Sequence, residues 1–197
     1  MPEIQTKRLF IAAFPPTSVV AKVESAVADL AKRIPDGSIR WTAAEKIHLT
    51  SNFLGSVGCS RIPELQVALS AACEPYRPHP VCVAGMGSFH KPTRPQVLWV
   101  GLTGDLQPLQ NLKTSIDTAL SALGFVPEKR AFHPHLTIGR ATNLNPNALK
   151  QIAEALKQNA DRNFGPWQID RIDLMQSTLS PRGANYTTIK AIPLKTP

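Results

Sequence analysis

The same three residues, His-Leu-Thr, occur twice in this chain of 197 residues, at His48–Thr50 and at His135–Thr137. Each copy lies in a short apolar run of the kind that forms a β-strand. Because side chains alternate between the two faces of a strand, the histidine and threonine of each copy share one face and the leucine points the other way. Two such strands side by side would place two imidazoles and two hydroxyls in one cavity.

Two imidazoles that face one scissile bond can supply both an acid and a base near neutral pH. One protonates a leaving oxygen while the other takes a proton from water. Hydroxyls beside them can donate to the non-bridging oxygens of a phosphate, as an oxyanion hole does. This set of groups suits cleavage of a phosphodiester, above all a strained cyclic one, without a metal. A single His-x-Thr often arises by chance, so the prediction depends on the repeat.

The charge balance of the chain favours an anionic partner. There are 22 Lys and Arg residues against 14 Asp and Glu, a formal net charge of +8, which suits RNA or nucleotides. No run of five basic residues forms an arm for DNA, and no apolar run is long enough to cross a membrane. Three cysteines without a CxxC spacing are typical of a reducing compartment. We therefore expect a cytoplasmic protein and, by default, a monomer.

Hydrophobic periodicity predicts strands and helices that alternate along the chain. The predicted strands cover residues 8–14, 39–41, 47–54, 80–89, 96–102, 132–140, 167–176 and 186–194. The predicted helices cover residues 17–34, 60–72, 104–123 and 145–156. Each half of the chain therefore follows the same order: strand, helix, strand with His-Leu-Thr, helix, strand.

This repeated order predicts an α+β protein with two similar lobes related by a pseudo-twofold axis. The likeness between the halves is structural, because outside the two motifs they share little sequence. No stretch resembles a flexible linker, so we expect residues 1–197 to form a single bilobal domain. Residues 90–95, which include two prolines, are the predicted crossing between the lobes.

The residues around both motifs extend the match beyond three positions. Trp41 precedes the first motif and Phe53-Leu54-Gly55 follows it, while the second lies in the run from Phe132 to Arg140. With the opening strand and the closing strand near Tyr186, these segments make the chain resemble the 2H phosphoesterase superfamily. Within it, the chain is most similar to the bacterial RNA 2′,3′-cyclic phosphodiesterases, historically called 2′-5′ RNA ligases. One departure is Ser51-Asn52, where an aliphatic residue is commoner.

The resemblance implies a bilobal fold in which antiparallel sheets line a central cleft and helices lie outside. It implies an enzyme that hydrolyses the 2′,3′-cyclic phosphate end of an RNA or oligonucleotide to a 2′-phosphate, with no cofactor. At matching positions, His48 would donate a proton to the leaving 3′-oxygen and His135 would activate water. Thr50 and Thr137 would hold the phosphate. The residues alone do not distinguish acid from base.

Four further residues are candidate substrate contacts. Arg140 lies five residues after His135, and strand alternation puts an odd offset on the opposite face. Contact between Arg140 and a phosphate therefore requires a twist or the end of the strand. Trp41, Phe14 and Tyr186 could stack on a base, with packing in the core as the alternative reading.

Two other readings remain open at this level. His133 shares the face of His135, so three histidines including His48 could in principle hold zinc. We do not favour this, because no carboxylate or cysteine ligand lies near either motif. The alternatives to hydrolysis of RNA ends are ATP-independent 2′-5′ ligation as the reverse reaction, hydrolysis of a small cyclic nucleotide, and binding of RNA ends without turnover. The chain has no Walker loop or GxGxxG, so ATP-driven ligation is not supported.

Overall fold

The computed structural model describes residues 5–89, 97–142, 144–181 and 183–195. In these residues the strands are β1 (Thr6–Ala13), β2 (Ile39–Trp41), β3 (Leu49–Gly58), β4 (His79–Phe89), β5 (Val97–Thr103), β6 (His135–Ala141), β7 (Asn163–Ile169), β8 (Arg171–Ser180) and β9 (Gly183–Pro193). The helices are α1 (Thr17–Ala31), α2 (Ile62–Cys73), α3 (Gln107–Ala122) and α4 (Pro146–Gln158), with short 3₁₀ turns at Ala44–Lys46 and Cys59–Arg61. None of the described helices is both long and apolar enough to span a membrane.

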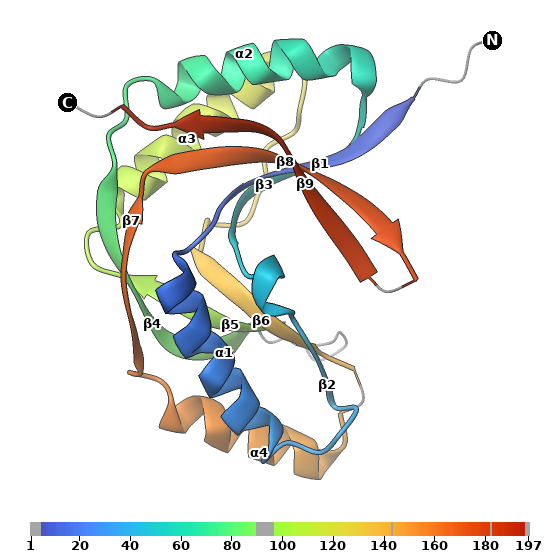
Figure 1. Cartoon of the computed structure of the whole chain (residues 1–197), viewed down its shortest axis with the longest axis vertical. Coiled ribbons are helices and arrows are strands. Elements are labelled where there is room, and N and C mark those ends of the chain that lie inside the picture. The colour runs from blue at the N-terminus through green and yellow to red at the C-terminus, as the bar shows by residue number, and fades with distance from the viewer. Residues whose placement is uncertain (1–4, 90–96, 143, 182, 196–197) are drawn as a thin grey trace.

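The strands pair into one nine-stranded sheet, ordered β7-β4-β5-β6-β3-β1-β8-β9, with β2 on β6 (Figure 1). The pairs are antiparallel, which confirms the predicted α+β class. An approximate twofold axis between β6 and β3 relates the β3 half (β3, β1, β8, β9) to the β6 half (β6, β5, β4, β7). The antiparallel sheets expected for two lobes are thus two halves of a continuous sheet.

The two halves of the sheet are not the two halves of the sequence. Helix α1 follows β1 of the β3 half but packs against β7 of the β6 half, and α3 follows β5 of the β6 half but packs against α2. Figure 1 shows α2 and α3 together at one end of the molecule and α1 and α4 together at the other. Each half is thus packed against a helix that follows a strand of the other half. The two halves therefore form one unit, and no segment resembling a linker separates them.

Two sequence-based expectations about the crossings need correction. The predicted crossing at residues 90–95 lies outside the described residues, but β4 and β5 on either side of it pair with each other, so both belong to the β6 half. The predicted strand 167–176 is in fact two strands, β7 and β8, separated at Asp170 and lying in different halves of the sheet. The buried apolar positions change phase at this point, from Trp167 and Ile169 to Ile172 and Leu174, and this break in the alternation marks the boundary between the two strands.

The central strand β1 buries both of its faces. Leu9, Ile11 and Ala13 point into the main core, which also includes the buried faces of the helices. Phe10 and Ala12 point the opposite way and form a separate small cluster with Met175. Each fully buried Leu, Ile or Phe side chain contributes about 1.5–3 kcal/mol of transfer free energy. The sheet therefore has a helix-covered face and an open face with its own apolar patch, and the second face carries the site.

Candidate active site

The two His-Leu-Thr motifs meet at the centre of the sheet. Strands β3 and β6 pair antiparallel with Leu49 opposite Leu136, and both leucines are buried in the core. In an antiparallel pair, the residue after Leu49 lies opposite the residue before Leu136. Thr50 is therefore beside His135, and His48 is beside Thr137 in the same way. Each histidine therefore lies next to the threonine of the other motif, and the pseudo-twofold axis passes between them.

An irregularity follows the threonine in both strands. In β3, Thr50 pairs with Ala12 and Asn52 with Ile11, which leaves Ser51 unpaired. In β6, Thr137 pairs with Trp99 and Gly139 with Leu98, which leaves Ile138 unpaired. Such a bulge shifts the alternation of side chains by one residue.

The two bulges return the residue five positions after each histidine to the open face. These residues are Phe53 in β3 and Arg140 in β6, and both line the same cavity as Thr50 and Thr137. Strand alternation alone would put Arg140 on the face opposite His135. The bulge at Ile138 brings Arg140 back to the face of His135.

Both catalytic candidates have the same backbone anchor. The Nδ1 atom of His48 lies 2.7 Å from the carbonyl oxygen of Lys46, and Nδ1 of His135 lies 2.7 Å from that of His133. A carbonyl only accepts, so Nδ1 carries the proton and donates in each ring. The Nε2 atom of each ring is then left to accept or donate a proton in a reaction.

The surroundings of the two rings lower the pKa of both. For His48 the main cause is burial; the hydrogen bond to the Lys46 carbonyl raises its pKa, and the charge of His135 lowers it further. For His135 the main cause is also burial; the His133 carbonyl raises its pKa, and the charges of His133 and Arg140 lower it. Burial disfavours the charged imidazolium, so both rings favour the neutral form before a substrate binds.

Aromatic rings enclose His48. The centre of its ring lies 5.1 Å from that of Phe10, 5.5 Å from Phe14 and 5.4 Å from Tyr186. Phe14 and Tyr186 were candidates for base stacking, and the structure places both against this histidine. The charge of Arg140 acts on the Tyr186 hydroxyl, whose pKa is raised by burial and lowered in part by that charge. Arg140 therefore lies within electrostatic range of both halves of the site.

His135 has different neighbours. Phe89 lies 4.8 Å from its ring centre, and Phe89 and Trp99 both contact the exposed His133. The Trp99 ring lies against Gly87 of β4, where a Cβ atom would clash with its Cζ2. Glycine at position 87 is therefore needed for this ring to pack there.

A cavity of about 670 Å³ opens beside the paired motifs. Thr50, His135, Thr137 and Arg140 line it. His48 is not among the lining residues, and it adjoins the cavity through its place opposite Thr137 in the paired strands. A volume of this order suits a ligand of nucleotide size. The site thus offers two hydroxyls, one imidazole and one guanidinium directly to a ligand, with the second imidazole adjoining.

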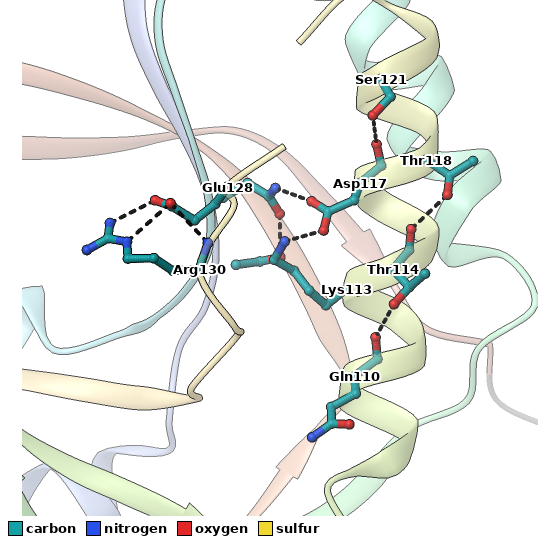
Figure 2. A network of polar contacts seen from close by, with 10 residues as sticks. Gln110, Lys113, Thr114, Asp117, Thr118, Ser121, Glu128 and Arg130 are labelled. Atoms are coloured by element: carbon teal, nitrogen blue, oxygen red, sulfur yellow. Dashed lines mark hydrogen bonds and ion pairs between the residues drawn. The ribbon is translucent and has the colours of Figure 1, made fainter. Parts of the chain in front are cut away.

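Residues of helix α3 and of the segment that follows it also line the cavity. Figure 2 shows Lys113 and Asp117 reaching from α3 toward the segment with Glu128 and Arg130. Lys113 is only 8% exposed and pairs with Asp117. Asp117 Oδ1 accepts a 2.7 Å hydrogen bond from Asn52 Nδ2. These polar groups also line the cavity, and they connect α3 to the strand that carries the first motif.

The remaining sequence candidates lie away from the cavity lining. Trp41 packs against the core, and its Cε3 atom would lie 3.1 Å from a Cβ on Gly139. In the part of the chain that the structure describes, no group of three or more His, Cys, Asp or Glu side chains is placed to hold a metal ion. Nothing in this geometry favours the three-histidine zinc reading.

Sequence reasoning missed Phe53, Asn52, Lys113 and Asp117 as parts of the site. For Phe53 a signal existed, since it occupies the same place after the first motif as Arg140 after the second. For Lys113 and Asp117 the signal was a pair of opposite charges at i and i+4 beside the apolar stripe of a helix. That pattern is usually a solvated salt bridge, and only the position of α3 turns it toward the cavity.

Comparison with known proteins identifies relatives over most of the chain. The 2′-5′ RNA ligase superfamily profile matches residues 15–180. An RNA 2′,3′-cyclic phosphodiesterase of Aeropyrum pernix is 32% identical over 146 residues, which cover 74% of this chain and 80% of the relative. A second protein of that name, from Archaeoglobus fulgidus, is 29% identical over 183 residues, 93% of this chain and 98% of the relative.

Solved structures show the same fold. The crystal structure of Escherichia coli LigT complexed with 3′-AMP superposes with a TM-score of 0.76 at 22% identity, covering 98% of this chain and all of that one. A Thermus thermophilus protein gives a TM-score of 0.72 at 23% identity, covering 95% and 97%. At these identities the likeness shows the fold alone.

Proposed function

The chain belongs to the 2′-5′ RNA ligase superfamily, and on that premise we propose that it hydrolyses RNA 2′,3′-cyclic phosphate ends to 2′-phosphomonoesters. It is an RNA 2′,3′-cyclic phosphodiesterase, like the curated relatives that cover most of its length. The observation that carries the proposal is the pairing of the two motifs at Leu49 and Leu136, with Thr50, His135 and Thr137 on one cavity. The basic charge of the chain, +8, suits a polyanionic substrate.

The cyclic phosphate would occupy the cavity between the two motifs. The hydroxyls of Thr50 and Thr137 donate to its non-bridging oxygens and stabilise the charge that develops there. The guanidinium of Arg140, on the same wall, adds a fixed positive charge to the phosphate. These donors act on an anion without a metal ion, so we propose that the reaction is metal-independent and needs no cofactor.

The two histidines divide the proton transfers. His135 takes a proton from water at Nε2 as the water oxygen bonds to phosphorus. The bond from phosphorus to the 3′-oxygen breaks, and His48 gives its Nε2 proton to that oxygen, which leaves a 2′-phosphate. The charges of His133 and Arg140 favour the neutral form of His135, which is the form a base must have. Burial lowers the pKa of His48 as well, so the roles of His135 as the base and His48 as the acid are proposed from the family resemblance.

Substrate binding raises the pKa of the acid. Burial lowers the pKa of His48 in the free protein, so a proton is held weakly there at neutral pH. A phosphodiester anion next to the ring stabilises the imidazolium and raises that pKa. His48 is therefore protonated to a greater extent when substrate is bound than in the free enzyme. No carboxylate partner for His48 is required.

The direct test uses an oligoribonucleotide with a 2′,3′-cyclic phosphate end, incubated with the protein in EDTA, followed by identification of the product isomer. We expect hydrolysis to the 2′-phosphate at a rate that the chelator does not change. Formation of the 3′-phosphate would reverse the assignment of the leaving oxygen. Loss of activity in EDTA and recovery with zinc would restore the three-histidine alternative.

A second activity follows from microscopic reversibility. The same two groups with exchanged proton roles can join a 2′,3′-cyclic end to a 5′-hydroxyl, giving a 2′-5′ bond without ATP. Hydrolysis should dominate because water is in large excess over RNA ends. In a time course on both oligonucleotides together, joining that outpaces hydrolysis would identify a ligase, and binding without any turnover would identify an RNA-end-binding module.

The remaining parts of the proposal concern the setting of the enzyme. All three cysteines are free, and Cys73 is buried, where burial raises its thiol pKa to about 11. Free thiols fit the predicted cytoplasmic location. We propose a monomer that acts on RNA ends. Stacking of Trp41, Phe14 or Tyr186 on a base stays a prediction, with their packing against the core and against His48 as the alternative.

A further inference from the structure

A second cavity, of about 520 Å³, opens beside the second His-Leu-Thr motif. Phe132 and His133 line both this cavity and the catalytic cavity, so the two hollows adjoin at these residues. A volume of this order suits a ligand of nucleoside size. The hydrolysis proposed above leaves this space without a role, and we call it the second cavity.

The second cavity lies at a place that is filled in the other half of the sheet. The register of β1 and β3, continued by one residue, brings Phe14 opposite His48, and the centres of the two rings are 5.5 Å apart. In the β6 half, the residue opposite His135 is Gly101, which lines the second cavity. Because glycine has no side chain, the space that Phe14 takes beside His48 is left open beside His135.

The wall farthest from the motif is held in place by a bulge in β4. At this bulge the N–H of Gly85 donates to the carbonyl of Arg162, in the turn between α4 and β7, at 2.9 Å. Gly85 approaches this turn so closely that a Cβ atom on it would lie 2.6 Å from the carbonyl oxygen of Ala160. The turn therefore forms a fixed wall of the second cavity, with Asp161 among its lining residues.

Trp99 forms the wall nearest to the motif. It pairs with Thr137 across β5 and β6, lines the second cavity and contacts the exposed His133, with ring centres 5.3 Å apart. Among the residues that the structure describes, its buried Nε1 atom has no hydrogen-bond partner. A buried donor that is left unpaired costs free energy, and an acceptor on a ligand would offset that cost.

The charge of the second cavity disfavours a phosphate. The described residues that line it include Asp161 and no Lys or Arg. By contrast, three cations line the catalytic cavity, namely Lys113, Arg130 and Arg140. Gln110 and Thr103, which also line the second cavity, can exchange hydrogen bonds with hydroxyls and with the edge of a base. The second cavity thus suits an uncharged nucleoside, whereas the catalytic cavity suits a phosphate.

The position of the second cavity relative to the reaction indicates which nucleoside this is. The attacking and leaving oxygens lie roughly in line on either side of phosphorus. In the mechanism proposed above, His135 takes the proton of the attacking oxygen and His48 protonates the leaving one. Any group attached to the attacking oxygen therefore extends from the His135 side, where Gly101 opens into the second cavity. Water carries no such group, whereas the 5′-hydroxyl of an RNA carries a nucleoside.

We propose that the second cavity binds the nucleoside at the 5′-hydroxyl end of a second RNA, the acceptor in 2′-5′ joining. This inference rests on the proposed function. In the joining step the 5′-oxygen bonds to phosphorus and its proton passes to His135. The bond from phosphorus to the 3′-oxygen breaks, and that oxygen takes the proton of His48, which leaves a 2′-5′ phosphodiester and a 3′-hydroxyl. Cleavage of this product is the same step run backwards, with the proton roles of the two histidines exchanged.

The test measures joining and hydrolysis in one reaction. The donor is an oligoribonucleotide with a 2′,3′-cyclic phosphate end and a 5′-phosphate, so it cannot serve as its own acceptor. The acceptor is a short oligoribonucleotide with a 5′-hydroxyl and no terminal phosphate. Joined and hydrolysed products are quantified at saturating donor over a series of acceptor concentrations. We expect the rate of joining to rise with acceptor and reach a plateau, because a binding site saturates.

A tryptophan at the rim should close the second cavity. Gln110 is exposed on α3 and lines this cavity, so Gln110→Trp adds bulk there without burying a polar group. Below the plateau, the ratio of joined to hydrolysed product should fall about tenfold, as expected for the loss of one nucleoside contact. The matched control is Thr118→Trp, exposed on the same helix and outside the lining of both cavities, which should keep the wild-type ratio.

Other outcomes overturn the proposal in distinct ways. If joining stays proportional to acceptor concentration and Gln110→Trp keeps the wild-type ratio, the acceptor reacts by collision and the second cavity has no part. If Gln110→Trp lowers joining and hydrolysis alike, the cavity serves the donor RNA or the catalytic groups. Hydrolysis without any joining would overturn this inference and leave the proposed function intact. If the wild-type protein hydrolyses no donor, the proposed function itself fails, and the acceptor site with it.

Discussion

The two histidines of this protein have the same backbone setting and different neighbours. Each donates from Nδ1 to the carbonyl two residues before it, at 2.7 Å in both cases. Around His48 lie the rings of Phe10, Phe14 and Tyr186. Around His135 lie one ring, Phe89, and the charges of His133 and Arg140. The shared anchor makes both rings usable as proton carriers, and the neighbours make them unequal.

The clearest difference lies five residues after each histidine. A bulge follows the threonine in both strands, and it turns Phe53 toward the cavity in the β3 half and Arg140 toward it in the β6 half. A symmetric backbone thus presents an apolar ring on one side and a cation on the other. An asymmetric substrate, with a base at one end and a charged phosphate at the reacting centre, fits such a site better than two identical half-sites would.

Removal of either imidazole should have the largest effect. His48→Ala and His135→Ala should each lower kcat by about 10²–10⁴, the usual range for a positioned acid or base. The double variant should lose much less than the product of the two, because the pair acts as a unit. Steady-state kinetics on a cyclic-phosphate oligonucleotide measures this, with circular dichroism as a control for folding. Near-normal turnover in either single variant would refute the assigned mechanism.

Loss of a threonine hydroxyl should have a smaller effect. Thr50→Ala and Thr137→Ala should each lower kcat by about 10²-fold, the lower end for an oxyanion donor. Thr→Ser at the same positions keeps the hydroxyl and should restore most of the rate. A large difference between the Thr50 and Thr137 variants would show that the two halves share the phosphate unequally. No recovery with serine would point to packing by the methyl group instead.

Replacement of Arg140 should change the pH dependence of kcat/KM and so separate the titration of His135 from that of His48. Both histidine pKa values are lowered, so kcat/KM should be bell-shaped with its maximum below the ordinary histidine value near 6.5. The Arg140 charge lowers the pKa of His135. Arg140→Gln should therefore raise that pKa and move the acidic limb, where the base becomes protonated, to higher pH. KM should also rise, because a phosphate contact is lost.

The control for that experiment is Lys32→Gln, which removes an exposed cation paired with Asp29 on α1. It alters net charge equally and should leave the profile in place. A shift of the alkaline limb alone in Arg140→Gln would exchange the roles of the two histidines. No shift of either limb would mean that solvent screens the guanidinium from His135.

Much of the site was readable from residue order. The repeated His-Leu-Thr, the strands around it and the alternation within each strand predicted which side chains share a face, because a strand places side chains with a period of two. The helices were equally clear from their apolar spacing, and a basic chain with paired histidines and threonines indicated an anionic phosphodiester. These are local properties, set by a few neighbouring residues.

Only the tertiary structure decided the rest. The bulges at Ser51 and Ile138 brought Phe53 and Arg140 into the cavity, and a bulge depends on pairing with a neighbouring strand. The break at Asp170 sent β7 and β8 to different halves of the sheet; the change of phase between Ile169 and Ile172 marks where the strand ends but not where the next strand pairs. The exchange of α1 and α3 between the halves turned Lys113 toward the site. Residue order alone determined the chemical groups and their faces, whereas contacts between distant segments determined which groups meet, because those contacts have no local periodicity to reveal them.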